Sequence, residues 1–227
     1  AAVADDVAFG GQPRELVAAD YVFTIKRYYD PQIPTEHLFH FENAKILGLS
    51  ELRQQALKAK TALNYDAPVP GLRALDRYRF EVRLAQPSPR FLQVFALPGL
   101  TGALAREVVE RYGAELPAHP VGTGPFQLKQ WRRGSMVLLE RNPRFREQRF
   151  DSLDPPQDAE TQALLKRLQG RRLPLVDEVQ INVIQDEQPR WLAFYGGEID
   201  VLEMPPTLAP VVVPGGQLAP NLARRGV

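Results

Sequence analysis

Two histidines have the clearest potential for metal chemistry in this sequence. His37 and His40 stand three positions apart, so on a helix they would share one face and could hold a metal ion together. No third ligand at a fixed spacing is nearby except Glu36 and Glu42. Because histidines beside aromatic residues more often pack or lie at the surface, we expect no metal and no cofactor, with His37 and His40 as the alternative metal ligands.

Two carboxylates near the C-terminal end could perform acid–base chemistry. Glu198 and Asp200 are two positions apart and would face the same side of a strand. The sequence around them supplies no nucleophile and no recognisable substrate pocket, and no serine stands in a GxSxG turn. We therefore expect that the protein is not an enzyme, and an unrelated hydrolase using this pair is the lowest alternative.

A glycine-rich stretch, PVGTGPF, could be mistaken for a nucleotide fingerprint. Gly122 and Gly124 begin a GxGxxG pattern, but Gln127 replaces the third glycine, and a strand follows where a phosphate-binding helix should begin. Two glycines and Pro125 within four residues instead predict a sharp turn where backbone can approach backbone closely. We interpret Gly122, Gly124 and Pro125 as a structural junction.

A β-hairpin is predicted directly after this junction. Residues 126–131 and 136–141 have the composition of two short strands, and the polar residues 132–135 between them include a glycine near the end of the connection. We expect the hairpin to be buried, with the junction behind it.

The other elements are short helices and strands separated by many of the 21 prolines. In the first helix, Tyr21, Ile25 and Tyr28 are spaced to form one buried side, and Asp20 is an acid favourable to the dipole of the first turn. Helices are predicted at 14–27, 50–62, 104–112, 159–168 and 188–195, a short helix before Pro98, strands within 71–84 and at 179–183, and a poorly ordered tail at 211–227.

Composition excludes several classes of partner. A formal net charge of +1 creates no field that favours nucleic acid, and no apolar run is long enough to span a bilayer, so neither nucleic acid nor membrane insertion is expected. Cysteine is absent, which removes disulfides and thiolate chemistry. The first eight residues lack the features of a secretion signal, so we expect a mature or trimmed chain.

Several separated motifs resemble one family of bacterial proteins. They are LVAADYVFTIKR at 16–27, PVGTGPF at 120–126, WRRG at 131–134, ERNPRF at 140–145 and GEIDV at 197–201. In this order they are similar to the motifs of the solute-binding proteins of peptide-type ABC importers, the dipeptide/oligopeptide/nickel-binding family. The resemblance implies a mixed α+β (α/β) fold of the type II periplasmic binding protein class. It covers part of that fold, with an accessory domain at 1–116 and part of ligand-binding lobe one at 117–227, interrupted by an insertion at about 147–172.

The resemblance also implies a function and a set of binding residues. The function is capture of di- or oligopeptides, or another small solute, in the periplasm and delivery to the transmembrane subunits of an ABC permease. A nickel or other metal complex, or haem, is the alternative ligand. Two segments would contact the ligand, namely Leu97, Pro98, Gly99, Leu100 and Thr101 in the first, and Leu202, Glu203, Met204 and Pro205 in the second.

Overall fold

The computed structural model of this chain describes residues 1–151 and 158–224. The chain divides into two compact units, the first formed by residues 1–129 and 138–179 and the second by residues 130–137 and 180–227. Residues 152–157 of the expected insertion and the last three residues of the expected tail lie outside the described part of the chain.

The first unit consists mainly of short helices, as its prolines and glycines predict. With η denoting 3-10 helices, its helices and first two strands are η1 (Val7–Phe9), α1 (Ala18–Tyr28), α2 (Leu38–Glu42), α3 (Leu49–Ala59), β1 (Leu72–Ala74), β2 (Phe80–Val82), α4 (Phe91–Val94), α5 (Pro98–Thr101), α6 (Arg106–Tyr112), η2 (Gly113–Ala118) and α7 (Ala159–Leu168). The predicted helix at 159–168 is confirmed, and α4 confirms the short helix expected before Pro98, which itself begins the further helix α5. Proline suits this first position because its missing N–H would have no partner there.

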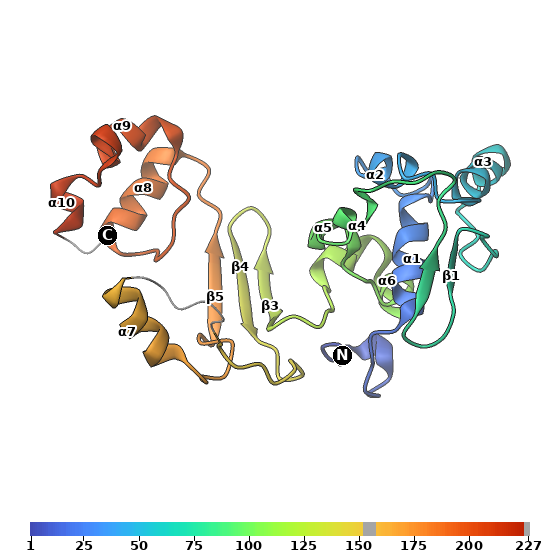
Figure 1. Cartoon of the computed structure of the whole chain (residues 1–227), viewed down its shortest axis with the longest axis horizontal. Coiled ribbons are helices and arrows are strands. Elements are labelled where there is room, and N and C mark those ends of the chain that lie inside the picture. The colour runs from blue at the N-terminus through green and yellow to red at the C-terminus, as the bar shows by residue number, and fades with distance from the viewer. Residues whose placement is uncertain (152–157, 225–227) are drawn as a thin grey trace. The chain divides into compact units, whose positions relative to one another are not determined.

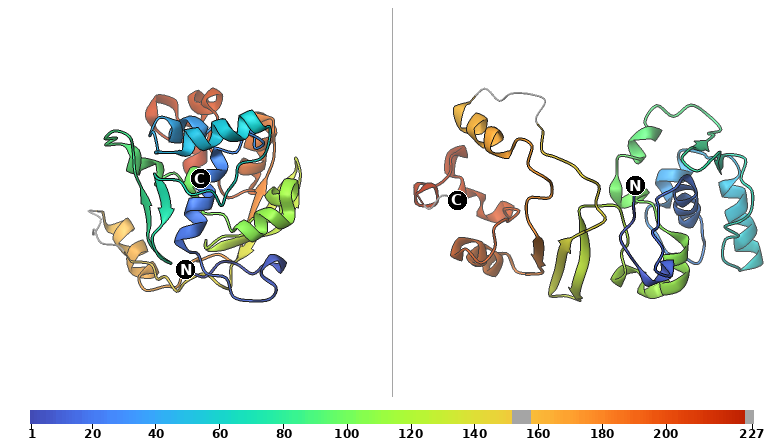
Figure 2. Two further views of the ribbon diagram at one scale, coloured as in Figure 1. Left: turned by 90° about the vertical axis from the view of Figure 1, so that its right-hand side faces the viewer. Right: turned by 90° about the horizontal axis from the view of Figure 1, so that it is seen from below.

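A small antiparallel hairpin lies along α1 (Figures 1 and 2). β1 and β2 pair in the register Leu72 with Val82, Arg73 with Glu81 and Ala74 with Phe80. On this hairpin, Arg73 and Glu81 form a cross-strand ion pair of 2.9 Å, while Leu72 turns into the core. The alternation predicted for this stretch therefore produces a two-stranded sheet with one buried side.

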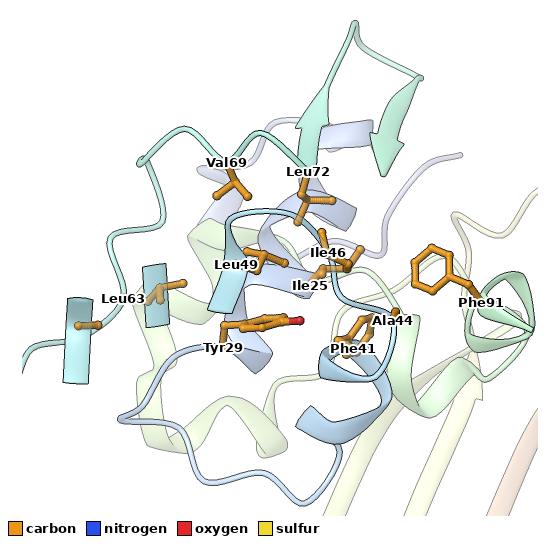
Figure 3. Close-up of a cluster of buried hydrophobic side chains, with 11 residues drawn as sticks. Ile25, Tyr29, Phe41, Ala44, Ile46, Leu49, Leu63, Val69, Leu72 and Phe91 are labelled. Atoms are coloured by element: carbon orange, nitrogen blue, oxygen red, sulfur yellow. The ribbon is translucent and has the colours of Figure 1, made fainter. Parts of the chain in front are cut away.

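The core of the first unit is built around α1 and α3 (Figure 3). Ile25 and Tyr29, four positions apart and therefore on one face, are 1% and 0% exposed. The predicted buried side is only partly correct, because Tyr21 and Tyr28 stay half-exposed and Tyr29 is the aromatic residue fully buried. The buried cluster comprises Ile25, Tyr29, Phe41, Ala44, Ile46, Leu49, Ala56, Leu63, Val69, Leu72 and Phe91.

The helix expected from residue 14 begins four residues later, at Ala18. Val17 is extended, and its N–H donates a 2.9 Å hydrogen bond to the carboxylate of Asp20 in the first turn. That carboxylate also accepts from the guanidinium of Arg14 at 2.6 and 3.0 Å, and Arg14 donates in addition to Glu107 of α6 at 2.6 Å. Asp20 therefore caps α1, while Arg14 ties α1 to α6.

A three-stranded sheet follows, with strand order β3-β4-β5. Its strands are β3 (Phe126–Arg132), β4 (Met136–Arg141) and β5 (Glu178–Asn182), so the predicted hairpin is confirmed to within one residue. Three residues form the loop, in which Gly134 has a φ of 72° and the N–H of Ser135 donates to the carbonyl of Arg132 at 3.0 Å. The expectation of a buried hairpin is wrong, because its side chains are half-buried or exposed.

The second unit contains α8 (Glu187–Gly196), η3 (Pro206–Leu208), α9 (Ala209–Val212), η4 (Pro214–Gly216) and α10 (Pro220–Ala223). Helix α8 confirms the helix predicted at 188–195, and Gly197 closes it in the left-handed conformation. The expectation of a poorly ordered tail is wrong for the residues described here, because Val212, Ala219 and Leu222 form a buried cluster with Trp191 and Tyr195. Burial of these scattered apolar residues outweighs the glycines and prolines that suggested disorder.

Candidate functional site

The first predicted binding segment forms α5 and the residue before it. Leu97, Pro98 and Gly99 are exposed, whereas Leu100 and Thr101 are each 6% exposed. The Thr101 hydroxyl lies 3.2–3.4 Å from the carbonyl oxygens of residues 94, 95 and 97, so it holds the turn together. Of the five residues of this segment, residues 97–99 are therefore the ones that present exposed surface, and the two buried residues after them support the turn.

Gly99 also borders a cavity of about 260 Å³ inside the first unit. The cavity is further lined by Arg27 and Tyr28 of α1 and by Thr35 and His37, which precede α2. The Tyr28 hydroxyl lies 3.4 Å from the Gly99 carbonyl, and burial raises the pKa of this phenol, so it stays protonated at neutral pH. The cavity thus gathers a cation, an imidazole and hydroxyl groups beside the predicted binding segment.

The second predicted segment has no regular secondary structure and lies in the second unit. Glu203 and Met204 are exposed, Leu202 is half-buried, and Pro205 is buried where its carbonyl accepts from Leu208 at 3.0 Å. No residue in the described part of the chain pairs with the Glu203 carboxylate. This segment and residues 97–101 belong to different compact units, so their meeting at one ligand stays a prediction.

The junction at 122–125 is held by hydrogen bonds to its backbone carbonyl groups. The expectation that its glycines are needed for a sharp turn with close backbone contact is wrong. Neither Gly122 nor Gly124 has a positive φ, and a Cβ would meet nothing within 4 Å at Gly122 and only the Phe126 carbonyl, at 3.9 Å, at Gly124. Instead, Asn142 is 3% exposed, its side-chain amide donates to the Gly124 carbonyl at 2.8 Å, and its backbone N–H donates to the Pro125 carbonyl at 2.9 Å. Asn142 lies inside the ERNP motif at 140–143, and this motif was the one feature of the sequence that could have pointed to the contact.

The two histidines gain no support as metal ligands. His37 precedes α2 and His40 lies within it, with ring centroids 6.1 Å apart, and the Phe39 ring lies 3.9 Å from that of His40. Across residues 1–151 and 158–224, no group of three or more potential ligand side chains is placed to hold a metal ion. The two histidine rings and Phe39 therefore form a cluster of tilted rings in and next to a short helix.

The carboxylate pair does not have the geometry that the acid–base interpretation required. Glu198 and Asp200 follow α8 in a turn and an irregular segment, so the same-side argument for a strand fails. Both side chains are exposed, in a stretch where water would compete for any reacting group.

No helix in the described ranges has both the length and the apolar character needed to cross a membrane.

Comparison with known proteins identifies relatives along most of the chain. Residues 11–219 match the family described as bacterial extracellular solute-binding proteins, family 5 Middle. The chain is 28% identical over 132 residues to the periplasmic oligopeptide-binding protein OppA of Salmonella typhimurium, covering 57% of this chain and 23% of OppA. It is 31% identical over 136 residues to the probable ABC transporter periplasmic-binding protein SapA of Escherichia coli, covering 58% of this chain and 22% of SapA.

Solved structures share the fold. The Escherichia coli murein tripeptide binding protein MppA matches with a TM-score of 0.62 at 19% identity, covering 89% of this chain and 34% of MppA. The chain thus spans about a quarter of the length of the curated relatives and a third of this structure. The expected partial, mixed α and β fold of a periplasmic binding protein is confirmed. The family match across 11–219, which includes every motif that suggested the resemblance, shows that this chain belongs to the bacterial extracellular solute-binding proteins of family 5.

Proposed function

We propose that this chain is part of an extracytoplasmic receptor that captures peptides and delivers them to the transmembrane subunits of an ABC importer. The observation that carries the proposal is the family match over residues 11–219, supported by relatives named as oligopeptide-binding and ABC transporter proteins. We assign it no catalytic role and place it in the periplasm.

The exposed parts of the two predicted segments suit a peptide. Leu97 and Pro98 offer apolar surface on a short rigid turn, and Met204 offers a flexible apolar side chain that adapts to different partners. Glu203 offers a carboxylate that no side chain in the described ranges pairs with, and it can attract a peptide amino group. A site that combines adaptable apolar contacts with few fixed charges accepts peptides of varied sequence.

Affinity should be limited in the chain studied alone. The chain spans about a third of MppA, and we expect it to supply part of a ligand-enclosing site. Losing three or four contacts of about 1–1.5 kcal/mol each weakens binding by several hundredfold or more. Binding should therefore be measured at millimolar peptide and by a method that locates contacts.

Hydrogen-exchange mass spectrometry with and without a mixture of short peptides tests the proposal. We expect slower exchange in the segments containing residues 97–101 and 202–204, reversed when the same peptides are hydrolysed to free amino acids. Leu97→Asp should abolish the effect, whereas the matched change Leu92→Asp on α4, where the side chain is 77% exposed, should leave it intact. Protection that is absent from both segments, or that persists in Leu97→Asp, would contradict the proposal.

A further inference from the structure

Arg27, whose guanidinium has no partner among residues 1–151 and 158–224, lines the 260 Å³ cavity, which we name the Arg27 cavity. Its Nε atom is buried and has no hydrogen-bond partner, and no carboxylate in the described chain forms a salt bridge with it. Two other arginines of the same unit each bind two carboxylates, Arg14 with Asp20 and Glu107, and Arg106 with Asp66 and Glu110. A buried polar group without a partner calls for an explanation such as a bound ion.

The surroundings of Arg27 favour a negative charge. No aspartate or glutamate lines the Arg27 cavity, and His37 is its other ionisable nitrogen group. On its other side, Arg27 borders an apolar recess formed by residues of α6, η2 and the chain around Val121. Because apolar walls lower the local dielectric constant, a guanidinium there attracts an anion more strongly than one at an open surface.

Hydroxyl groups also line the Arg27 cavity, and one of them can donate a hydrogen bond to a ligand. The Thr35 hydroxyl accepts a 3.1 Å hydrogen bond from the His37 backbone N–H, which leaves its own O–H free to donate. The Thr24 hydroxyl is already committed, because it donates to the Asp20 carbonyl and accepts from the Leu104 N–H, both at 2.8 Å. Arg27, His37 and Thr35 are thus the groups available to a ligand.

We propose that the Arg27 cavity binds the carboxylate of a small organic acid. A planar guanidinium pairs with a carboxylate through two parallel hydrogen bonds, and Thr35 and His37 supply further donors. A volume of about 260 Å³ lies below the roughly 300–1,000 Å³ of sites for drug-sized ligands, so the ligand is small. Arg27, His37 and Thr35 belong to the first unit and lie outside both predicted peptide-binding segments, although Gly99 of the first segment also borders the cavity.

Thermal unfolding of the 227-residue chain tests this site, with sodium succinate or acetate compared with sodium chloride at equal ionic strength. We expect the Tm to rise relative to sodium chloride, by about 3–6 °C at ten times the Kd of the carboxylate, and to keep rising with the logarithm of its concentration. Arg27→Gln should need at least ten times more carboxylate for the same rise in Tm, and Arg27→Lys should restore part of the response, since lysine keeps the charge without the planar fork. Arg90→Gln is the matched control, because Arg90 is exposed and lies outside the cavity.

A second variant keeps the test valid if Arg27→Gln does not fold. Thr35→Val should weaken the response severalfold while leaving the charge in place, and calorimetric titration with succinate should show the same order of affinities. If the Tm of the unmodified chain does not rise above that in sodium chloride, the site is overturned. It is also overturned if the dependence of Tm on carboxylate concentration is unchanged in Arg27→Gln or, where that variant is unfolded, in both Arg27→Lys and Thr35→Val. An equal response to phosphate would overturn the assignment to carboxylates.

Discussion

The side-chain amide of Asn142 donates a 2.8 Å hydrogen bond to the carbonyl oxygen of Gly124, across 18 positions of the sequence. The backbone N–H of Asn142 donates to Pro125, and its side-chain oxygen accepts from the N–H of Arg144 at 2.9 Å. One buried asparagine therefore holds the segment that enters the β3–β4 hairpin against the segment that leaves it.

Replacing Asn142 should destabilise the chain measurably. In Asn142→Ala, the Gly124 carbonyl and the Arg144 N–H each lose a hydrogen bond to this buried side chain, and we expect the free energy of unfolding to fall by about 1–3 kcal/mol in urea titrations. Asn221→Ala, at an exposed position of α10, should stay within about 0.5 kcal/mol of the unmodified chain. Equal stability of the two variants would show that Asn142 does not hold the hairpin.

Replacing glycines one at a time should show which of them the backbone conformation requires. Gly134 has a positive φ, whereas Gly122 belongs to the PVGTGPF motif but has no positive φ. Gly134→Ala should lower the free energy of unfolding by about 1 kcal/mol, because φ at this position is 72°. Gly122→Ala should change it little, since a Cβ there meets nothing within 4 Å. Paired denaturation curves give the comparison, and a larger cost at Gly122 than at Gly134 would refute this account of the junction.

The sequence predicted the positions of helices and strands better than it predicted the tertiary contacts of individual residues. Strands β3 and β4 and helix α7 appeared where strand composition or apolar spacing indicated, because these signals are local. The start of α1 was misplaced because Arg14 pairs with Asp20 and Glu107, and the contact with Glu107 spans 93 positions. Asn142, Arg27 and the packing of the tail likewise depend on contacts between distant segments, which no local pattern encodes.

Tyr29, which is fully buried, and Tyr65, which is half-buried, should respond to loss of the hydroxyl in opposite ways. The Tyr29 hydroxyl is buried without a partner, so Tyr29→Phe should leave the free energy of unfolding unchanged or raise it by up to about 1 kcal/mol. The Tyr65 hydroxyl donates to Asp30 at 2.7 Å, so Tyr65→Phe should lower it by about 1–2 kcal/mol. Chemical denaturation of both variants checks the difference, and a loss in Tyr29→Phe equal to that in Tyr65→Phe would contradict it.

Acidification should weaken the contact between Arg14 and α6. The hydrogen bonds from Arg14 lower the pKa of Glu107 below its ordinary value. A carboxyl whose pKa is lower in the folded state stabilises the fold above its unfolded pKa of about 4.3, and this stability is lost as pH falls through the folded value. In Glu107→Gln, thermal unfolding from pH 7 to pH 3 should show a smaller drop in Tm than in the unmodified chain. Glu203→Gln, whose carboxylate has no partner among the described residues, should show the same drop as the unmodified chain.

Photo-crosslinking with a short peptide that carries a photoreactive side chain tests peptide capture most directly, because it traps weak complexes and reports the residues in contact. The account predicts crosslinks at residues 97–99 and 202–204, lost on competition with excess unlabelled peptide and in Leu97→Asp. Crosslinks confined to other parts of the chain, or insensitive to competitor, would contradict it.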